Sequence, residues 1–316
     1  MLVIYDPTHL LHNPTTELYD GVATPSPETP DRIETIKKSL EELLQLCWKN
    51  PDNFSDEEAL TLHSKPYIEY LRESSSRLVK GQECVTSNFI HDTYAPISNG
   101  TWAAARSALN TALTGAQSLL QGDDNAVYVL CRPPGHHAGD AYMGGYCFFN
   151  NAGAAANYLS AHGRVAILDI DYHHGNGTQQ LFYERSDVLY VSIHANPANQ
   201  YPYTNGFEAE TGLGKGLGFN KNIVVEKYCG WDIYSHAFTE ALEAVTQFKP
   251  DYLVVSLGFD GYKDDPIAGF GLSIENFGQI SSEIKKLGLP TLLVQEGGYC
   301  IEALGDLAKE IVENLS

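Results

Sequence analysis

The stretch that decides the fold is residues 164–177, which read RVAILDIDYHHGNG. Its apolar start, residues 165–168, has the composition of a strand buried in a sheet. Because alternate side chains of an extended segment share a face, Asp169, Asp171 and His173 are predicted to point the same way at the end of this strand. Buried carboxylates are costly unless they are paired or hold a metal, and Asp and His suit a catalytic divalent ion such as zinc. The alternative interpretation is a solvated polar loop.

Apolar runs and helical patterns alternate along the rest of the chain. We expect strands at residues 2–5, 126–131, 164–169, 188–194, 252–257 and 290–295. We expect helices at residues 32–47, 56–62, 66–79, 100–120, 148–162, 178–185, 231–247, 273–288 and 301–315. Strands that alternate with helices indicate an α/β fold with a parallel sheet covered on both faces. Segments 8–31 and 81–99 are predicted to be irregular, the first of them a long surface loop.

Length and composition limit the possible functions. The 316 residues contain no Pro/Gly/Ser linker or internal repeat, so we expect a single domain over residues 1–316. Lys and Arg number 20 and Asp and Glu number 40, and the net charge of −20 argues against nucleic-acid binding because phosphates would be repelled. An acidic protein attracts cationic ligands, although solubility alone explains the charge equally well.

Export and membrane insertion are both unexpected for this chain. The first residues lack the basic and apolar regions of a signal peptide, and no apolar run approaches transmembrane length. The 6 cysteines are scattered without a CxxC pair, and several lie in apolar runs, so we expect reduced and mostly buried thiols. These features predict a cytoplasmic protein.

Polar residues directly follow four of the predicted strands. RPPGHH at 132–137, the opening motif, GFD at 258–260 and EGGY at 296–299 each begin where an apolar run ends. Ligands of open α/β sheets bind beyond the carboxyl ends of the strands. The four clusters are therefore expected to form one shared site.

Three residues of these clusters are candidate metal ligands. A catalytic zinc takes three protein ligands and keeps one position for water or substrate, which matches Asp171, His173 and Asp260. For Asp260 taken alone, an Asx-turn or a helix N-cap would be the more ordinary role. His136 and His137 follow a stiff Pro-Pro-Gly turn and are suited to proton transfer, because histidine titrates near neutral pH.

Other side chains are candidates for supporting this centre. Asp169 and Asn176 are candidates to hydrogen-bond the two histidines and fix their tautomers. Tyr299 follows two glycines that permit close backbone approach, and it is a candidate donor to a developing oxyanion. Tyr146 and Tyr201 are candidate walls of a narrow channel, with core packing as the alternative.

The ordered set of motifs resembles the histone deacetylase superfamily. The motifs are RPPGHHA at 132–138, GGYCFFNN at 144–151, DIDYHHGNGTQ at 169–179, SLGFD at 256–260, DPI at 265–267 and EGGY at 296–299. Within the superfamily they are most similar to the bacterial acetylpolyamine amidohydrolases and the class II-type deacetylases. The resemblance runs through most of the chain from residue 100 to residue 299.

This resemblance implies an arginase/deacetylase-like fold with a mostly parallel central sheet, and zinc-dependent hydrolysis of an acetyl amide. The ligands of Zn²⁺, or of Fe²⁺ as the other metal left open, would be Asp171, His173 and Asp260. His137 would be the general base and then the acid, with His136 as its electrostatic partner. Tyr299 would donate a hydrogen bond to the oxyanion.

The resemblance also implies roles around the catalytic group. The substrate channel would use Gly145, Tyr146, Tyr201, Ile267 and Asp92. Asp92 would be an acidic residue at the rim, although an Asx-turn is an equally good interpretation. A structural K⁺ would be bound by Asp169, Asp171, His173 and Ser192. Some relatives have Asp where this chain has Asn176, and the neutral amide is expected to leave the pKa of His137 lower than a carboxylate would.

Two substrate classes fit this site, acetyl-lysine side chains and acetylpolyamines. We predict a deacetylase that accepts acetyl-lysine peptides, with acetylpolyamines as a further substrate class and a dedicated acetylpolyamine amidohydrolase as the alternative. Polyamine enzymes of the family carry a long insertion used in dimerisation, and residues 72–99 are too short for it, so any oligomer is expected to form differently. The motifs give less support to a non-catalytic acyl-lysine binding module or to an arginase-type ureohydrolase, which needs two metals.

Overall fold

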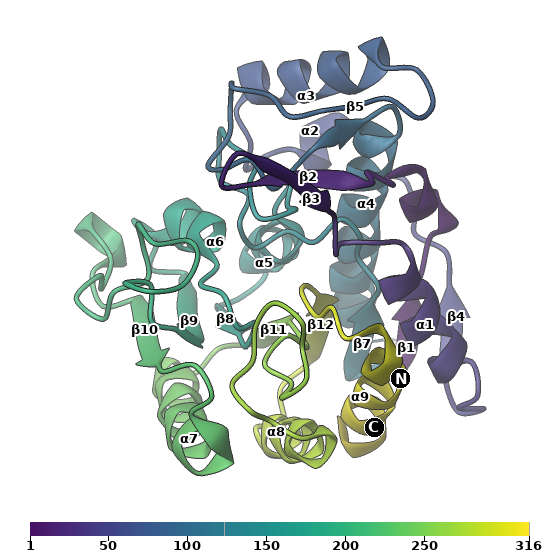
Figure 1. Cartoon of the computed structure of the whole chain (residues 1–316). Helices are drawn as coiled ribbons and strands as arrows, with labels where there is room; N and C mark the ends of the chain where they lie inside the picture. The colour runs from purple at the N-terminus through teal and green to yellow at the C-terminus, as the bar shows by residue number, and fades with distance from the viewer. Residues whose placement is uncertain (123, 316) are drawn as a thin grey trace.

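The central sheet has eight parallel strands in the computed structural model, which describes residues 1–122 and 124–315. The strand order is β10-β9-β8-β11-β12-β7-β1-β4, from one side of the molecule to the other (Figure 1). The strands are β1 (Leu2–Ile4), β4 (Cys47–Lys49), β7 (Ala126–Val129), β8 (Val165–Asp169), β9 (Val188–Ala195), β10 (Asn220–Val225), β11 (Tyr252–Leu257) and β12 (Thr291–Gln295). All residues of β7, β8, β9 and β12 are buried, as expected for a sheet that is covered on both faces.

Helices form a layer on each face of this sheet (Figure 1). Alternate side chains of a strand enter opposite layers, so on β11 Val255 packs in one layer and Val254 in the other. One layer contains α1 (Asp31–Leu40), α7 (Gly230–Phe248), α8 (Ile274–Lys286) and α9 (Ile301–Leu315). The other contains α4 (Thr101–Gln121), α5 (Asn151–Ser160) and α6 (Asn176–Phe182). The predicted α/β fold in a single domain is confirmed.

A third apolar cluster extends the second layer. Tyr67 and Leu71 pack there with Leu109 of α4 and with Phe148 and Phe149. Further elements lie outside the two layers: α2 (Asp56–Ala59), α3 (Lys65–Arg77), the antiparallel pair β5 (Glu83–Cys84) and β6 (Ile97–Ser98), and the 3₁₀ turns η1 (Pro7–Leu11) and η2 (Gly214–Gly216). This cluster holds the segment after residue 81 against the main body.

The two edges of the sheet differ from the sequence prediction. The helix expected over 32–47 ends at Leu40, and Cys47–Lys49 forms β4, which pairs with β1. Strand β10, which reads NKNIVV, is also absent from the prediction. Edge strands need bury only part of their surface, so neither of them has the apolar run that marks the central strands.

The prediction of a surface loop over residues 8–31 is wrong. Strands β2 (Thr16–Tyr19) and β3 (Val22–Pro25) form a hairpin there. Asp20 and Gly21 connect them with φ values of 49° and 79°. An Asp-Gly pair between two strand-forming runs is a strong hairpin signal, because this tight turn needs positive φ at both positions.

The expectation of mostly buried thiols is also wrong. All six cysteines are free, but only Cys131 and Cys147 are buried, whereas Cys47 is exposed and the others are partly exposed. Across residues 1–122 and 124–315, no helix is both long and apolar enough to cross a membrane.

Candidate active site

The four polar clusters lie beside one another because of the strand order. They follow β7, β8, β11 and β12, and these strands occupy consecutive positions β8-β11-β12-β7 in the centre of the sheet. Parallel strands present their carboxyl ends at the same edge. The sequence therefore places the clusters at strand ends, and the strand order makes them neighbours.

Asp171, His173 and Asp260 form a candidate metal centre. One ligand atom of each lies within 4.8 Å of the others. His173 Nδ1 is 2.9 Å from Asp260 Oδ2 and 3.3 Å from Asp171 Oδ1. Burial, together with the charge of Asp171, raises the pKa of Asp260 to about 7, so the Asp260 carboxylate lacks a full counter-charge. Burial would also raise the pKa of Asp171, but His136 and His173 hold it below its usual value. A divalent cation would supply that charge, and three oxygen and nitrogen ligands leave a coordination position open.

Gly297 brings the backbone of the EGGY motif against these carboxylates. Its N–H donates to Asp171 Oδ2 at 2.9 Å. A Cβ at this position would lie 2.6 Å from Asp171 Oδ2 and 2.9 Å from Asp260 Oδ2, so any side chain would displace the ligands. The next residue, Gly298, has a φ of 113°, which L side chains rarely adopt.

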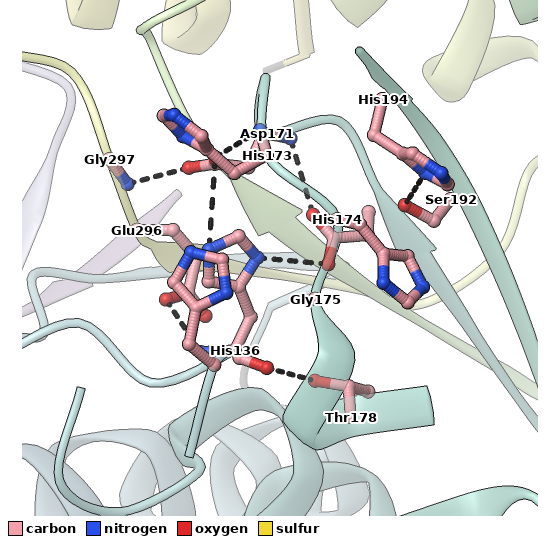
Figure 2. A network of polar contacts seen from close by, with 12 residues as sticks. His136, Asp171, His173, His174, Gly175, Thr178, Ser192, His194, Glu296 and Gly297 are labelled. Atoms are coloured by element: carbon pink, nitrogen blue, oxygen red, sulfur yellow. Dashed lines mark hydrogen bonds and ion pairs between the residues drawn. The ribbon is translucent and has the colours of Figure 1, made fainter. Parts of the chain in front are cut away.

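His136 is surrounded by carboxylates (Figure 2). Its Nδ1 is 3.1 Å from Asp169 Oδ2, and its Nε2 is 3.7 Å from Asp171 Oδ1. Glu296 Oε2 accepts hydrogen bonds from the His136 N–H at 3.1 Å and the Gly135 N–H at 2.6 Å, which holds the turn. Burial alone would lower the pKa of His136, but Asp171 and Asp169 raise it to about 10.

His137 has the opposite environment. Its Nδ1 lies 2.8 Å from Asn176 Oδ1, a neutral amide. Burial and the neighbouring His136 and His173 hold its pKa well below the usual value. Adjacent histidines whose pKa values move apart can take the roles of a fixed cation and a base.

A cavity of about 330 Å³ opens above the metal centre. Its floor contains His137, His173 and Tyr299. Of the predicted channel residues, it is lined by Gly145, Tyr146, Tyr201 and Ile267. The remaining lining residues are Glu17, Tyr19, Tyr94, Gln200, Tyr203 and Pro266. Two contacts anchor Tyr299. The Arg32 guanidinium carbon lies 4.7 Å from the centre of the Tyr299 ring, and the backbone N–H of Tyr299 donates to Asp265 Oδ2 at 2.7 Å.

Asp92 lies behind this lining and not on it. One carboxylate oxygen accepts from the Tyr94 N–H at 2.7 Å, which is the Asx-turn. The other accepts from the Gly145 N–H at 2.9 Å and from the Tyr201 hydroxyl. Asp92 therefore forms the Asx-turn and also positions two residues of the cavity wall, Gly145 and Tyr201.

Glu17 is the main lining residue that the sequence prediction lacks. It lies on β2, it is 7% exposed, and its Oε2 has no hydrogen-bond partner among the described residues. Burial raises the pKa of Glu17 to about 7, opposed by the Tyr146 hydroxyl beside the carboxyl and aided by Asp92. The signal that would have found it is the Asp20-Gly21 hairpin, which turns β2 into an ordered element.

Ser192, the expected K⁺ ligand, lies on β9 directly opposite Asp169 of β8. Its Oγ is 2.8 Å from His194 Nδ1. Figure 2 shows this contact between the two side chains. Asp169 Oδ1 accepts from the Asp171 N–H at 3.2 Å. The expected K⁺ ligands are therefore neighbours.

Comparison with known proteins identifies the family. Residues 26–315 match the Histone deacetylase domain. The chain is 40% identical to Acetylpolyamine amidohydrolase 1 of Pseudomonas aeruginosa over 345 aligned positions, which cover 99% of this chain and 98% of the relative. It is 32% identical to Histone deacetylase HDA1 of Saccharomyces cerevisiae over 98% of this chain and 47% of that protein.

Solved structures agree with this assignment. An acetylpolyamine aminohydrolase from Burkholderia pseudomallei has a TM-score of 0.95 at 36% identity, with 100% of this chain and 98% of the other covered. The HD domain of HDA15 has a TM-score of 0.89 at 28% identity, and the match covers 100% of this chain and 90% of the HDA15 chain. The chain therefore belongs to the histone deacetylase family, in its bacterial acetylpolyamine amidohydrolase branch, and is a deacetylase-type amide hydrolase.

Proposed function

We propose that the preferred substrates of this deacetylase are small acetylated amines with a second, protonated amine, as in acetylpolyamines. The observation that supports this is Glu17, a buried carboxyl in the wall of the cavity whose Oε2 has no hydrogen-bond partner within residues 1–122 and 124–315. An ammonium group would satisfy that oxygen, and the net charge of −20 would attract cations to the protein.

The proposed mechanism divides the work among a few residues. A zinc ion held by Asp171, His173 and Asp260 would lower the pKa of a water molecule and polarise the acetyl carbonyl. His137, kept neutral, would accept a proton at its unpaired ring nitrogen and then deliver it to the leaving amine.

Two further residues would stabilise negative charge in this mechanism. His136 would remain positively charged beside the reaction centre, since its pKa is raised to about 10. Tyr299 would donate its hydroxyl to the developing oxyanion, and the two glycines before it allow that close approach.

The experiment compares acetylputrescine with N-butylacetamide, which has the same chain length without the distal amine. In the E17Q variant, kcat/KM for acetylputrescine should fall about tenfold or more, because a charge-assisted hydrogen bond is lost. The value for N-butylacetamide should not change. E208Q is the matched control, since Glu208 is exposed and outside the cavity. An equal loss on both substrates would contradict ammonium recognition by Glu17.

Acetyl-lysine peptides are the second candidate substrate class. Tyr19, Tyr203 and Ile267 line the cavity and are 51%, 52% and 38% exposed, so the cavity reaches the surface where a lysine side chain could enter. An acetyl-lysine peptide measured alongside acetylputrescine decides the preference. A higher kcat/KM for the peptide would overturn the polyamine proposal and leave the deacetylase assignment intact.

The identities of the metals are also proposals. We infer one divalent ion per chain, Zn²⁺ with Fe²⁺ as the alternative, and a structural K⁺ near Asp169 and Ser192. Metal analysis of protein purified under anaerobic conditions separates zinc from iron. Two tightly bound divalent ions per chain would instead favour the arginase type of centre. A Tm that does not depend on K⁺ would contradict the structural K⁺.

A further inference from the structure

Tyr142 lies on the far side of Asn176 from His137. It is half-buried and lines a second cavity of about 810 Å³, which is separate from the substrate cavity. Its hydroxyl donates to the backbone carbonyl of Asn176 at 3.4 Å and accepts from Asn176 Nδ2 at 3.4 Å. None of the motif-based roles includes this tyrosine.

The orientation of the Asn176 amide decides which nitrogen of His137 can act as a base. An amide has one accepting end and one donating end. With Oδ1 toward His137, the ring must donate from Nδ1, so the neutral imidazole keeps Nε2 free to accept a proton. With the amide reversed, Nδ2 would donate to Nδ1, the ring proton would move to Nε2, and the base would be lost.

We propose that Tyr142 is a positioning residue for deacetylation, because its hydroxyl orients the Asn176 amide and thereby fixes the tautomer of His137. A hydroxyl has one proton. Since Tyr142 donates that proton to the Asn176 carbonyl, its oxygen faces the amide as an acceptor and binds the donating end. A carboxylate at position 176 would need no such selection, because both of its oxygens accept.

The turn that carries Tyr142 is anchored to the helix that carries Asn176. Asp140 and Gln180 exchange two hydrogen bonds. The Asp140 N–H donates to Gln180 Oε1 at 3.1 Å, and Gln180 Nε2 donates to Asp140 Oδ1 at 2.9 Å. The Gly139 N–H donates to the Tyr142 carbonyl at 3.1 Å and closes the turn. The hydroxyl is therefore held in register with the first residue of α6.

The test is a double-mutant cycle with Y142F, N176D and Y142F/N176D in the zinc-loaded enzyme. In the Asn176 background, Y142F should lower kcat about three- to tenfold with little change in KM, the size expected for one hydrogen bond. In the N176D background the same substitution should have almost no effect on kcat. Y183F, which alters another tyrosine of the second cavity, is the control and should leave kcat unchanged.

A second measurement reads the tautomer without turnover. The ¹⁵N NMR signals of His137 are assigned by their loss in the H137A variant. In the wild type they should show the Nδ1-protonated form of the ring, and in Y142F they should show a mixture of the Nδ1- and Nε2-protonated forms. An equal kcat loss in both backgrounds, or an unchanged tautomer in Y142F, would overturn the proposal. The inference rests on the proposed reaction, but an inactive wild type would refute that reaction while the NMR result still decides the role of Tyr142.

Discussion

The floor and the rim of the substrate cavity are built in different ways. The floor, defined as His137, His173 and Tyr299 with the other two metal ligands, comes from residues that directly follow sheet strands. The rim, defined as Glu17, Tyr19, Tyr94 and Tyr203, comes from the β2–β3 hairpin and from long loops. We infer that the floor sets the chemistry and the rim sets the substrate, so substitutions in the two regions should change different kinetic constants.

The largest expected effect is at the floor. The D260N variant removes a charged ligand from the metal centre, so zinc content should fall. Substituting a residue that only orients a metal ligand costs about 10- to 100-fold in activity, so the loss of a ligand itself should lower kcat/KM by more than about a hundredfold. All substrates should be affected equally. Metal analysis and steady-state kinetics measure both quantities, and full zinc content with nearly normal turnover would remove Asp260 from the ligand set.

A smaller, substrate-selective effect is expected at the rim. Because burial raises the pKa of Glu17 to about 7, its carboxyl is mostly protonated at pH 6 and mostly ionised at pH 8. The ionised form binds an ammonium, so KM for acetylputrescine should fall up to about tenfold as the pH rises between these values. N-butylacetamide has no ammonium group, so its KM over the same pH range shows how much of the pH dependence comes from the floor. If E17Q retains the trend in KM, another group is responsible.

The smallest expected effect again concerns the floor. In the N176D variant, a carboxylate would stabilise the protonated form of His137 and raise its pKa. A general base acts only when it is deprotonated, so the acidic limb of the kcat/KM profile should move to higher pH, by about one unit. An unmoved acidic limb would show that Asn176 does not control the base. KM values for acetylputrescine and N-butylacetamide should keep their ratio, since the rim is unchanged.

The parts of the fold that the sequence predicted are those with strong local patterns. The buried strands β7, β8, β9, β11 and β12 are apolar runs, and the polar residues that follow them identify the site. The edge strands β4 and β10 have no such run, and the helix prediction extended through Cys47 for that reason. The β2–β3 hairpin had a local signal, Asp20-Gly21, that the surface-loop prediction did not use.

The site shows the same division. The contacts of Asp169 with His136 and of Asn176 with His137 agree with the pairing expected from the sequence. Glu17 and Tyr142 could not be paired with the site in this way, because their partners are distant in the chain or depend on how a turn packs against α6. For Asp92 the structure shows the Asx-turn, whereas the expected place at the rim is not observed, because the carboxylate holds Gly145 and Tyr201 from behind the cavity lining.

The sequence by itself determined the α/β class, the family and the chemical types gathered at the strand ends. These follow from hydrophobic runs and from residues adjacent to them, which are local properties of the chain. Only the tertiary structure decided which strand ends are neighbours, which carboxyl lines the rim, and why His136 and His137 have opposite pKa shifts. Those outcomes depend on burial and on charges brought together from distant segments, and no local pattern records them.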